Sequence, residues 1–162
     1  MIILGIDPGT AITGFGLVEK TGSKIKYIKC GCVTTCAGLP LAERIKCIYD
    51  DILALIKEYQ PVAAAVEELF FFKNVKTAIT VAQARGGILL AIQQFGLPLA
   101  EYTPLQIKQS LTGYGRADKL QIQQMVKRIL RLNKIPQPDD AADALAVAIC
   151  HANSEKLNSI CK

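Results

Sequence analysis

The chain opens with the stretch Ile2-Ile3-Leu4-Gly5-Ile6-Asp7-Pro8-Gly9, in which an apolar run ends in a single carboxylate. A short continuous apolar run bounded by a turn signal is typical of a buried strand. Side chains at the ends of central strands in α/β sheets commonly meet a ligand. We therefore expect a buried strand over residues 2–7 that presents Asp7 at its carboxyl end.

The next two segments are also strand-like and are joined by short turns. Residues 13–19 follow the turn Pro8-Gly9, and residues 25–33 follow Thr21-Gly22-Ser23. Strands connected by such short turns pair antiparallel, because a parallel pair needs a long crossover. The first part of the chain thus predicts a three-stranded meander.

Helices and strands alternate in the rest of the chain. Residues 41–59 repeat apolar side chains at intervals of three and four, as an amphipathic helix does, and Pro61 ends the helix. The apolar strand over 62–66 follows a helical crossover and should lie parallel to a strand of the meander. The remaining expected elements are a helix over 75–95, a strand over 98–102 and helical segments near 104–112, 118–132 and 140–153.

This pattern predicts an α/β fold with a mixed five-stranded sheet flanked by helices, in the element order β-β-β-α-β-α-β-α-α. The 162 residues contain no repeat, low-complexity segment or linker, so we expect a single domain over residues 1–162. A charge or polar group interrupts each apolar stretch before bilayer-spanning length, and the first strand lacks the features of a signal peptide. We expect a cytoplasmic protein with no membrane segment.

The helix expected over residues 75–95 is apolar on two faces. One stripe consists of Val75, Ile79, Ala82, Gly86 and Leu89, and the other of Val81, Ala84, Ile88, Ala91, Ile92 and Phe95. A helix of this kind must bury both faces. One face can cover the sheet, and the other packs either within the monomer or against a second subunit. A homodimer is thus one of two alternatives.

Further acids lie at the ends of expected elements, as Asp7 does. Glu67 directly follows a short apolar strand, where a buried and unpaired carboxylate is costly. Asp140 and Asp143 are three apart in an alanine-rich helix and share one face of it. Either Asp139 or Asp140 could cap this helix, and capping alone would account for Asp139. If the carboxylates converge, the expected counter-ion is a hard divalent cation such as Mg²⁺ or Mn²⁺. The converging set is Asp7, Glu67, Asp140 and Asp143.

Such a cluster favours metal-assisted phosphoryl chemistry. Two metal ions about 4 Å apart can clamp both reacting oxygens in phosphodiester cleavage. His151 is the only histidine, so a histidine-based mechanism has no partner residue. Cys30, Cys32 and Cys36 lack the paired spacing of a structural zinc site, and we expect free thiols.

The charge distribution points to a polyanionic partner. The net charge is +5, and residues 108–134 contain seven basic side chains with Asp118 as their only acid. A cationic patch of this kind favours nucleic acid. The alternative for the patch alone is a solvated helix face without a ligand.

In order and at matching intervals, these motifs resemble those of the RuvC family of bacterial Holliday-junction resolvases. The resemblance runs from Ile2 to about His151. The matching segments are Leu4-Gly5-Ile6-Asp7-Pro8-Gly9 with Thr13-Gly14-Phe15-Gly16, Val66-Glu67-Glu68-Leu69-Phe70 with Lys73-Asn74, Gln83-Ala84-Arg85-Gly86, Tyr102, Lys108, Gly113-Tyr114-Gly115-Arg116-Ala117-Asp118-Lys119 and Asp140-Ala141-Ala142-Asp143-Ala144-Leu145-Ala146.

The resemblance implies a ribonuclease H-like fold and a symmetric homodimer. It implies a Mg²⁺-dependent endonuclease that resolves four-way DNA junctions by paired nicks, in recombination and repair. Catalysis and metal binding would belong to Asp7, Glu67, Asp140 and Asp143, with two Mg²⁺ per subunit, for which Mn²⁺ can substitute. The residues placed at the DNA are Phe70, Lys73, Lys108, Arg116 and Lys119. A branch-migration helicase complex is implied as a further partner.

Three alternatives stand beside this interpretation. The opening motif also resembles the phosphate loop of actin-like ATPases and sugar kinases, although those proteins need a second lobe. A shorter resolvase-like family, linked to ribosomal RNA maturation, shares the motif and would make RNA the substrate. A DNA-binding or scaffolding module would use the carboxylates only for capping and solvation.

Overall fold

The computed structural model describes residues 1–69 and 75–160, with side chains described for residues 1–69 and 77–154. The strands are β1 (Ile2–Asp7), β2 (Ile12–Thr21), β3 (Lys24–Thr34), β4 (Ala63–Glu67) and β5 (Leu99–Tyr102). The helices are α1 (Leu41–Tyr59), α2 (Val75–Gln94), α3 (Pro104–Thr112), α4 (Lys119–Ile129) and α5 (Asp139–Ile160). Within the described residues, no helix has the length and apolar character that crossing a membrane requires.

The five strands form one mixed sheet in the order β3-β2-β1-β4-β5. β1 pairs antiparallel with β2, and β2 with β3, which confirms the predicted meander. β1 pairs parallel with β4, and β4 with β5, as the helical crossovers require. β1 is therefore the central strand, and Asp7 and Glu67 end their strands at the same edge of the sheet.

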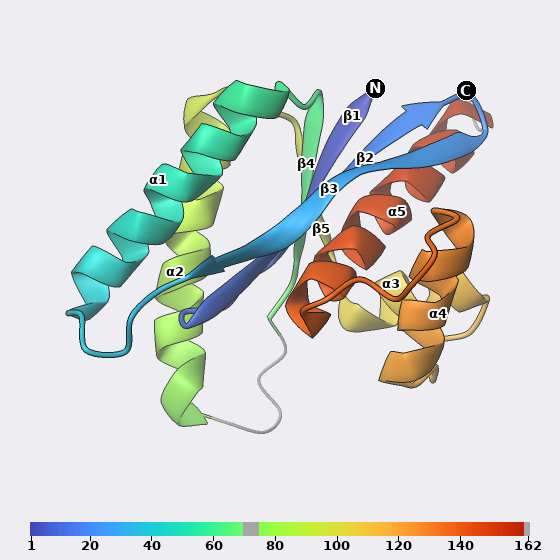
Figure 1. The fold of residues 1–162 in the computed structure, drawn as a ribbon. Coiled ribbons are helices and arrows are strands. Elements are labelled where there is room, and N and C mark those ends of the chain that lie inside the picture. The colour runs from blue at the N-terminus through green and yellow to red at the C-terminus, as the bar shows by residue number, and fades with distance from the viewer. Residues whose placement is uncertain (70–74, 161–162) are drawn as a thin grey trace.

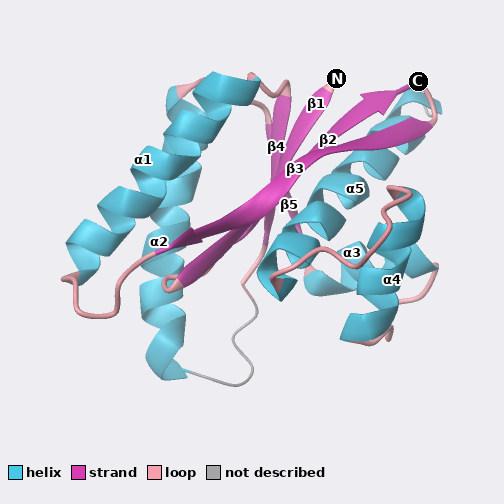
Figure 2. Cartoon of the chain, viewed as in Figure 1, coloured by secondary structure: helices cyan, strands magenta, loops and turns pink. Residues whose placement is uncertain are grey.

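Helices cover both faces of this sheet (Figures 1 and 2). α1 and α2 lie on one face, over a core that includes Leu4, Ile6 and Ile88. α3, α4 and α5 lie on the other face, over a core that includes Ile3 and Ile149. Alternate residues of β1 thus enter opposite cores, which explains why the strand is apolar along its whole length.

Three helices follow β5, which confirms the three predicted helical segments, although the predicted element order contains only two. α3 ends at Gly113, whose φ of 81° lies in the left-handed region that favours glycine. Asp118 then begins α4, since its side chain accepts a hydrogen bond from the Gln121 amide in a capping box. These stop and start signals keep the helical segments near the end of the chain separate.

α2 buries only one of its two apolar faces. The residues that face the sheet core and are buried are Ala84, Ile88, Ala91 and Ile92. On another side of the helix, Ile79 and Leu90 are 65% and 61% exposed. Ala82 and Gly86 lie between them and are exposed as well. Of the predicted second stripe, Leu89 is partly buried against the sheet core, whereas Ile79, Ala82 and Gly86 are exposed together with Leu90.

Candidate active site

Asp7 and Glu67 are neighbours on the face of the sheet that α5 covers. Ile6 of β1 pairs with Val66 of β4, so the residues that follow them lie side by side. Ile6 and Val66 enter the core beneath α1 and α2. Because side chains alternate along a strand, Asp7 and Glu67 point to the opposite face, toward α5.

Two glycines bring the start of α5 against the same edge of the sheet. Gly14 pairs with Asp7, and a Cβ atom on Gly14 would lie 2.0 Å from the carbonyl oxygen of Asp140. A Cβ atom on Gly5 would lie 2.3 Å from the carbonyl oxygen of Ala144. Only glycine permits so close an approach between helix and strand backbones. The first turns of α5 therefore hold its two predicted ligand carboxylates beside Asp7.

The carboxylates are close enough to perturb one another. Burial raises the pKa of Asp7 to about 8, and the negative charges of the other three carboxylates add to the rise. Burial also raises the pKa of Glu67 to about 7, with a further contribution from Asp143. A hydrogen bond with Asp7 and the positive charge of Lys108 oppose that rise. Burial and mutual repulsion thus raise the pKa of both carboxyl groups.

Lys119 supplies positive charge at one side of this cluster. Its Nζ lies 3.2 Å from Oδ2 of Asp139 and 3.3 Å from Oδ2 of Asp143. Nε2 of Gln123 also donates a hydrogen bond to Oδ1 of Asp139, at 3.0 Å. These contacts lower the pKa of Asp139, whereas burial keeps the pKa of Asp143 raised despite the lysine. Asp139 therefore positions Lys119.

A cavity of about 240 Å³ opens beside the cluster. Its wall consists of Glu67, Asp143, Lys108 and Lys119, together with the less polar Pro104, Ile107, Ile122 and Ala146. Two acidic and two basic side chains thus face one space. This combination fits a phosphodiester whose charge is shared between lysines and cations held by carboxylates. The other two predicted ligands, Asp7 and Asp140, are described residues that do not line this cavity.

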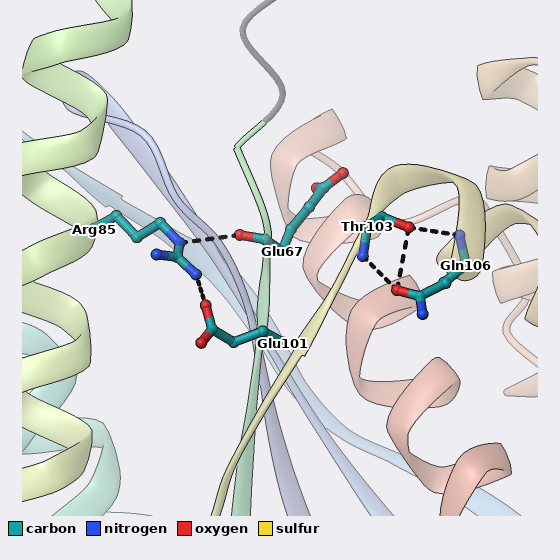
Figure 3. Close-up of polar contacts among 5 residues, drawn as sticks. All are labelled: Glu67, Arg85, Glu101, Thr103 and Gln106. Atoms are coloured by element: carbon teal, nitrogen blue, oxygen red, sulfur yellow. Dashed lines mark hydrogen bonds and ion pairs between the residues drawn. The ribbon is translucent and has the colours of Figure 1, made fainter.

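The connection from β5 to α3 places Lys108 on this cavity. The Thr103 side chain accepts a hydrogen bond from the Gln106 amide, and the Gln106 side-chain oxygen accepts one from the Thr103 amide. Pro104 occupies the first turn, where its missing N–H has no consequence. Figure 3 shows this reciprocal cap near Glu67. The cap fixes where α3 begins, and Lys108 follows one turn later.

The remaining predicted residues do not line this cavity or lie outside the described residues. Arg116 is exposed on the connection between α3 and α4. Phe70 and Lys73 lie outside the described residues. Cys30, Cys32 and Cys36 form no disulfide within the part of the chain that the structure describes.

The donor atoms of the cluster fit a hard divalent cation, because buried like charges that raise one another's pKa are relieved by such an ion. Within residues 1–69 and 75–160, however, no three acidic, histidine or cysteine side chains are arranged as ligands of one ion. A cation shared by these carboxylates would require their side chains to move together. The contact of Lys119 with Asp143 is one that such a rearrangement would alter.

A contact of Arg85 near Glu67 has no counterpart among the sequence-predicted roles. Nε of Arg85 donates a hydrogen bond to the Glu67 carbonyl oxygen, and its guanidinium pairs with Glu101 (Figure 3). Arg85 lies in a segment that resembles the family, but the resemblance does not predict which residues Arg85 contacts. A bond between a helix side chain and a strand carbonyl 18 residues away leaves no signal in a single sequence.

A ribonuclease H-like sheet with carboxylates at the ends of β1 and β4 and at the start of α5 defines a nuclease domain of that fold class. The chain matches the family model for crossover junction endodeoxyribonuclease RuvC over residues 3–151. It belongs to this family, which confirms the resemblance seen in its motifs.

Individual relatives agree with this assignment. The crossover junction endodeoxyribonuclease RuvC of Desulfitobacterium hafniense is 60% identical over 157 residues, which cover 97% of this chain and 95% of the relative. The protein of the same name from Clostridioides difficile is 57% identical over 162 residues, which cover 100% of this chain and 96% of the relative.

Solved structures confirm the fold class. Thermus thermophilus RuvC is 37% identical and superposes with a TM-score of 0.90, over 98% of this chain and 97% of that chain. The same protein in complex with a Holliday junction substrate gives a TM-score of 0.93 at 37% identity, with the same coverage of 98% and 97%.

Proposed function

We propose that this protein is a structure-selective endonuclease that resolves four-way DNA junctions by paired symmetric nicks, in recombination and repair. Family membership supports the proposal, as does the likeness to T. thermophilus RuvC, whose solved complex contains a Holliday junction substrate. The observation in this chain that carries it is the contact of the Asp140 backbone with Gly14, because it sets α5 carboxylates beside Asp7. We further propose that residues 1–162 act as one nuclease domain.

We assign catalysis and metal binding to Asp7, Glu67, Asp140 and Asp143. The expected cofactor is Mg²⁺, two ions per subunit, and Mn²⁺ can substitute because it also prefers carboxylate oxygens. Such ions neutralise charge on the phosphodiester and activate water for in-line attack. The closeness of the other three carboxylates to Asp7, which contributes to its raised pKa, supports this assignment, because a bound cation would relieve their repulsion.

Lys108 and Lys119 are assigned to the scissile phosphate. Both line the cavity beside Glu67, and their ammonium groups act as point charges toward phosphate oxygens. Lys119 would exchange its contact with Asp143 for a contact with the DNA. Pro104, Ile107 and Ile122 supply the apolar part of the wall beside the phosphate.

The other DNA contacts that we propose come from the sequence. Phe70 is assigned to stacking on bases near the crossover, a contact worth roughly 1–3 kcal/mol per base. Lys73 and Arg116 are assigned to the phosphate backbone, where they would make binding salt-dependent. The exposure of Arg116 supports its part of this assignment.

A homodimer is proposed as the active form. The exposed apolar stripe of α2, formed by Ile79, Ala82, Gly86 and Leu90, supports it because small residues allow close helix packing. Two sites related by a two-fold axis would cut two strands of a junction symmetrically. A branch-migration helicase complex is proposed as a partner, and a cytoplasmic location follows from the proposed chromosomal substrate.

A cleavage assay tests this function. Purified protein is incubated with a synthetic four-way junction or with a linear duplex of the same arm sequence, in Mg²⁺ or in EDTA. We expect symmetric nicks in two strands of the junction, only with the metal and not in the duplex. Equal cleavage of the duplex, or binding of the junction without cleavage in either Mg²⁺ or Mn²⁺, would contradict the proposal. The second result would favour a binding or scaffolding module.

A further inference from the structure

Arg85 connects α2 to the backbone of the strand that carries Glu67. Its Nε donates a hydrogen bond to the Glu67 carbonyl oxygen at 3.4 Å, and its Nη2 pairs with Oε2 of Glu101. In Figure 3, Arg85 approaches β4 from the α2 side, while the Glu67 side chain extends in the opposite direction. The arginine thus contacts the peptide group of Glu67 and leaves its carboxylate facing α5.

The charge of Arg85 is largely removed from water. Its side chain is only 17% exposed, compared with 40% for Glu101. A guanidinium in this position needs partners, because an unpaired charge at low exposure is unfavourable. The planar guanidinium can reach a carboxylate and a carbonyl at the same time, which a lysine ammonium does less well. A lysine at position 85 would therefore keep the ion pair with Glu101 and lose the hydrogen bond to the Glu67 carbonyl, so this replacement distinguishes the two contacts.

Glu67 is the last residue of β4, so the contact of its carbonyl oxygen with Arg85 affects how the end of the strand is held. Glu67 pairs with Tyr102 of β5, and the Glu68 amide donates a hydrogen bond to the Tyr102 carbonyl at 2.8 Å. The ladder between β4 and β5 includes no pair beyond Glu67. The end of a strand opens more easily than its middle. The direction of the Glu67 side chain therefore depends on contacts that hold its own peptide.

We propose that Arg85 is a positioning residue for Glu67, which it holds through the carbonyl oxygen while Glu101 anchors the guanidinium. The inference rests on the proposed function, because it takes Glu67 as a metal ligand of the nuclease. Loss of the contact lets the end of β4 shift and weakens the binding of divalent cations at the cluster. A displacement of about 1 Å far from the chemistry can slow a reaction about 100-fold.

Four variants of the full-length protein test the proposal. Arg85→Met removes both contacts and keeps an apolar stem of similar length. Arg85→Lys keeps a charge opposite Glu101. The double variant Arg85→Glu with Glu101→Arg restores an ion pair, but a carboxylate at position 85 cannot donate to the Glu67 carbonyl. Lys46→Met is the matched control, because it removes an ion pair with Asp50 on the outer surface of α1.

The measurements separate positioning from stability. We expect Arg85→Met to cleave a four-way junction about 10- to 100-fold more slowly at saturating junction, to require more Mg²⁺ for half-maximal rate and to bind the junction normally. Arg85→Lys is expected to show a smaller loss. The double variant should regain the unfolding midpoint of the wild type but remain slow. Lys46→Met should match the wild type in rate and in Mg²⁺ requirement.

Two results would overturn the proposal. One is an Arg85→Met protein with unchanged rate and Mg²⁺ requirement, and the other is a double variant whose rate recovers together with its stability. Titration with Mn²⁺, followed by electron paramagnetic resonance, needs no cleavage and is expected to show weaker binding by Arg85→Met than by Lys46→Met. If the wild type cleaves no junction, the proposed function fails, and equal Mn²⁺ affinities of these two variants would overturn the role of Arg85 separately.

Discussion

Nζ of Lys119 lies 3.3 Å from Oδ2 of Asp143. The same lysine lines the cavity that we assign to the scissile phosphate, and Asp139 holds it there at 3.2 Å. One side chain thus neutralises a proposed metal ligand and is available to a DNA phosphate. A cation that binds Asp143 must compete with this lysine, and the competition can be measured.

Lys119→Met should have opposite effects on metal binding and on catalysis. The exchange removes the competing charge, so we expect Mn²⁺ to bind the DNA-free protein about fivefold more tightly, which corresponds to a partly exposed ion pair of about 1 kcal/mol. Junction cleavage should nevertheless slow, because the phosphate loses a cation. Resonance titration and single-turnover cleavage measure the two effects, with Lys127→Met on the same helix as the control. Weaker Mn²⁺ binding by Lys119→Met would contradict the competition.

The stability of EDTA-treated protein should fall as the pH rises from about 4 to about 8. Burial raises the pKa of Asp7 from 3.8 to about 8 and that of Glu67 from 4.5 to about 7. Both groups take up protons more readily in the folded than in the unfolded protein, so their contribution is complete below pH 4 and lost as pH rises through the folded pKa values. Thermal unfolding across this range measures the loss.

Two comparisons isolate the origin of this pH dependence. Asp7→Asn should flatten the profile between pH 5 and pH 8, because the amide does not titrate. Added Mg²⁺ should stabilise the wild type more at pH 8 than at pH 5, since the ion binds the deprotonated carboxylates. A profile that rises over this window in EDTA would show that the carboxylates do not repel one another in the folded protein.

Gly14→Ala should destabilise the protein and remove activity. The added Cβ atom would lie 2.0 Å from the carbonyl oxygen of Asp140, so α5 must move away from β1 and β2. Overpacking of this kind typically costs about 1–3 kcal/mol, which urea unfolding can measure. Gly38→Ala is a suitable control, because its nearest neighbour would be the Cys36 sulfur at 4.0 Å. Equal stability of the two variants would contradict the close packing of α5 against the sheet at Gly14.

Leu90→Glu should produce a monomer if α2 forms the proposed dimer interface. Leu90 is 61% exposed in the apolar stripe of α2, and a charge there would have to be buried between two subunits. Light scattering coupled to size exclusion measures the mass. Val62→Glu serves as the control, because Val62 is 47% exposed outside this stripe. A monomeric wild type, or a Leu90→Glu protein that remains dimeric, would contradict the interface.

Features that are local in sequence could be predicted, and those that depend on contacts between distant segments could not. The apolar runs before Asp7 and Glu67 were sufficient to predict two buried parallel strands that end side by side. The alanine-rich sequence around Asp143 predicted a helix that carries two carboxylates on one face. Its contact with Gly5 and Gly14 became evident only with the register of the sheet. Asp139 was expected to cap the helix, but its carboxylate contacts Lys119 and Gln123, and these contacts depend on the packing of α4 beside α5.

The most direct test of the nuclease assignment is the effect of Asp7→Asn on a four-way junction, with binding and cleavage measured on the same preparation. The exchange keeps the size of the side chain but removes the central negative charge of the cluster. We predict that the variant binds the junction with nearly the affinity of the wild type and produces no nicks in Mg²⁺ or Mn²⁺. A folded Asp7→Asn protein that nicks the junction at the wild-type rate would contradict the assignment.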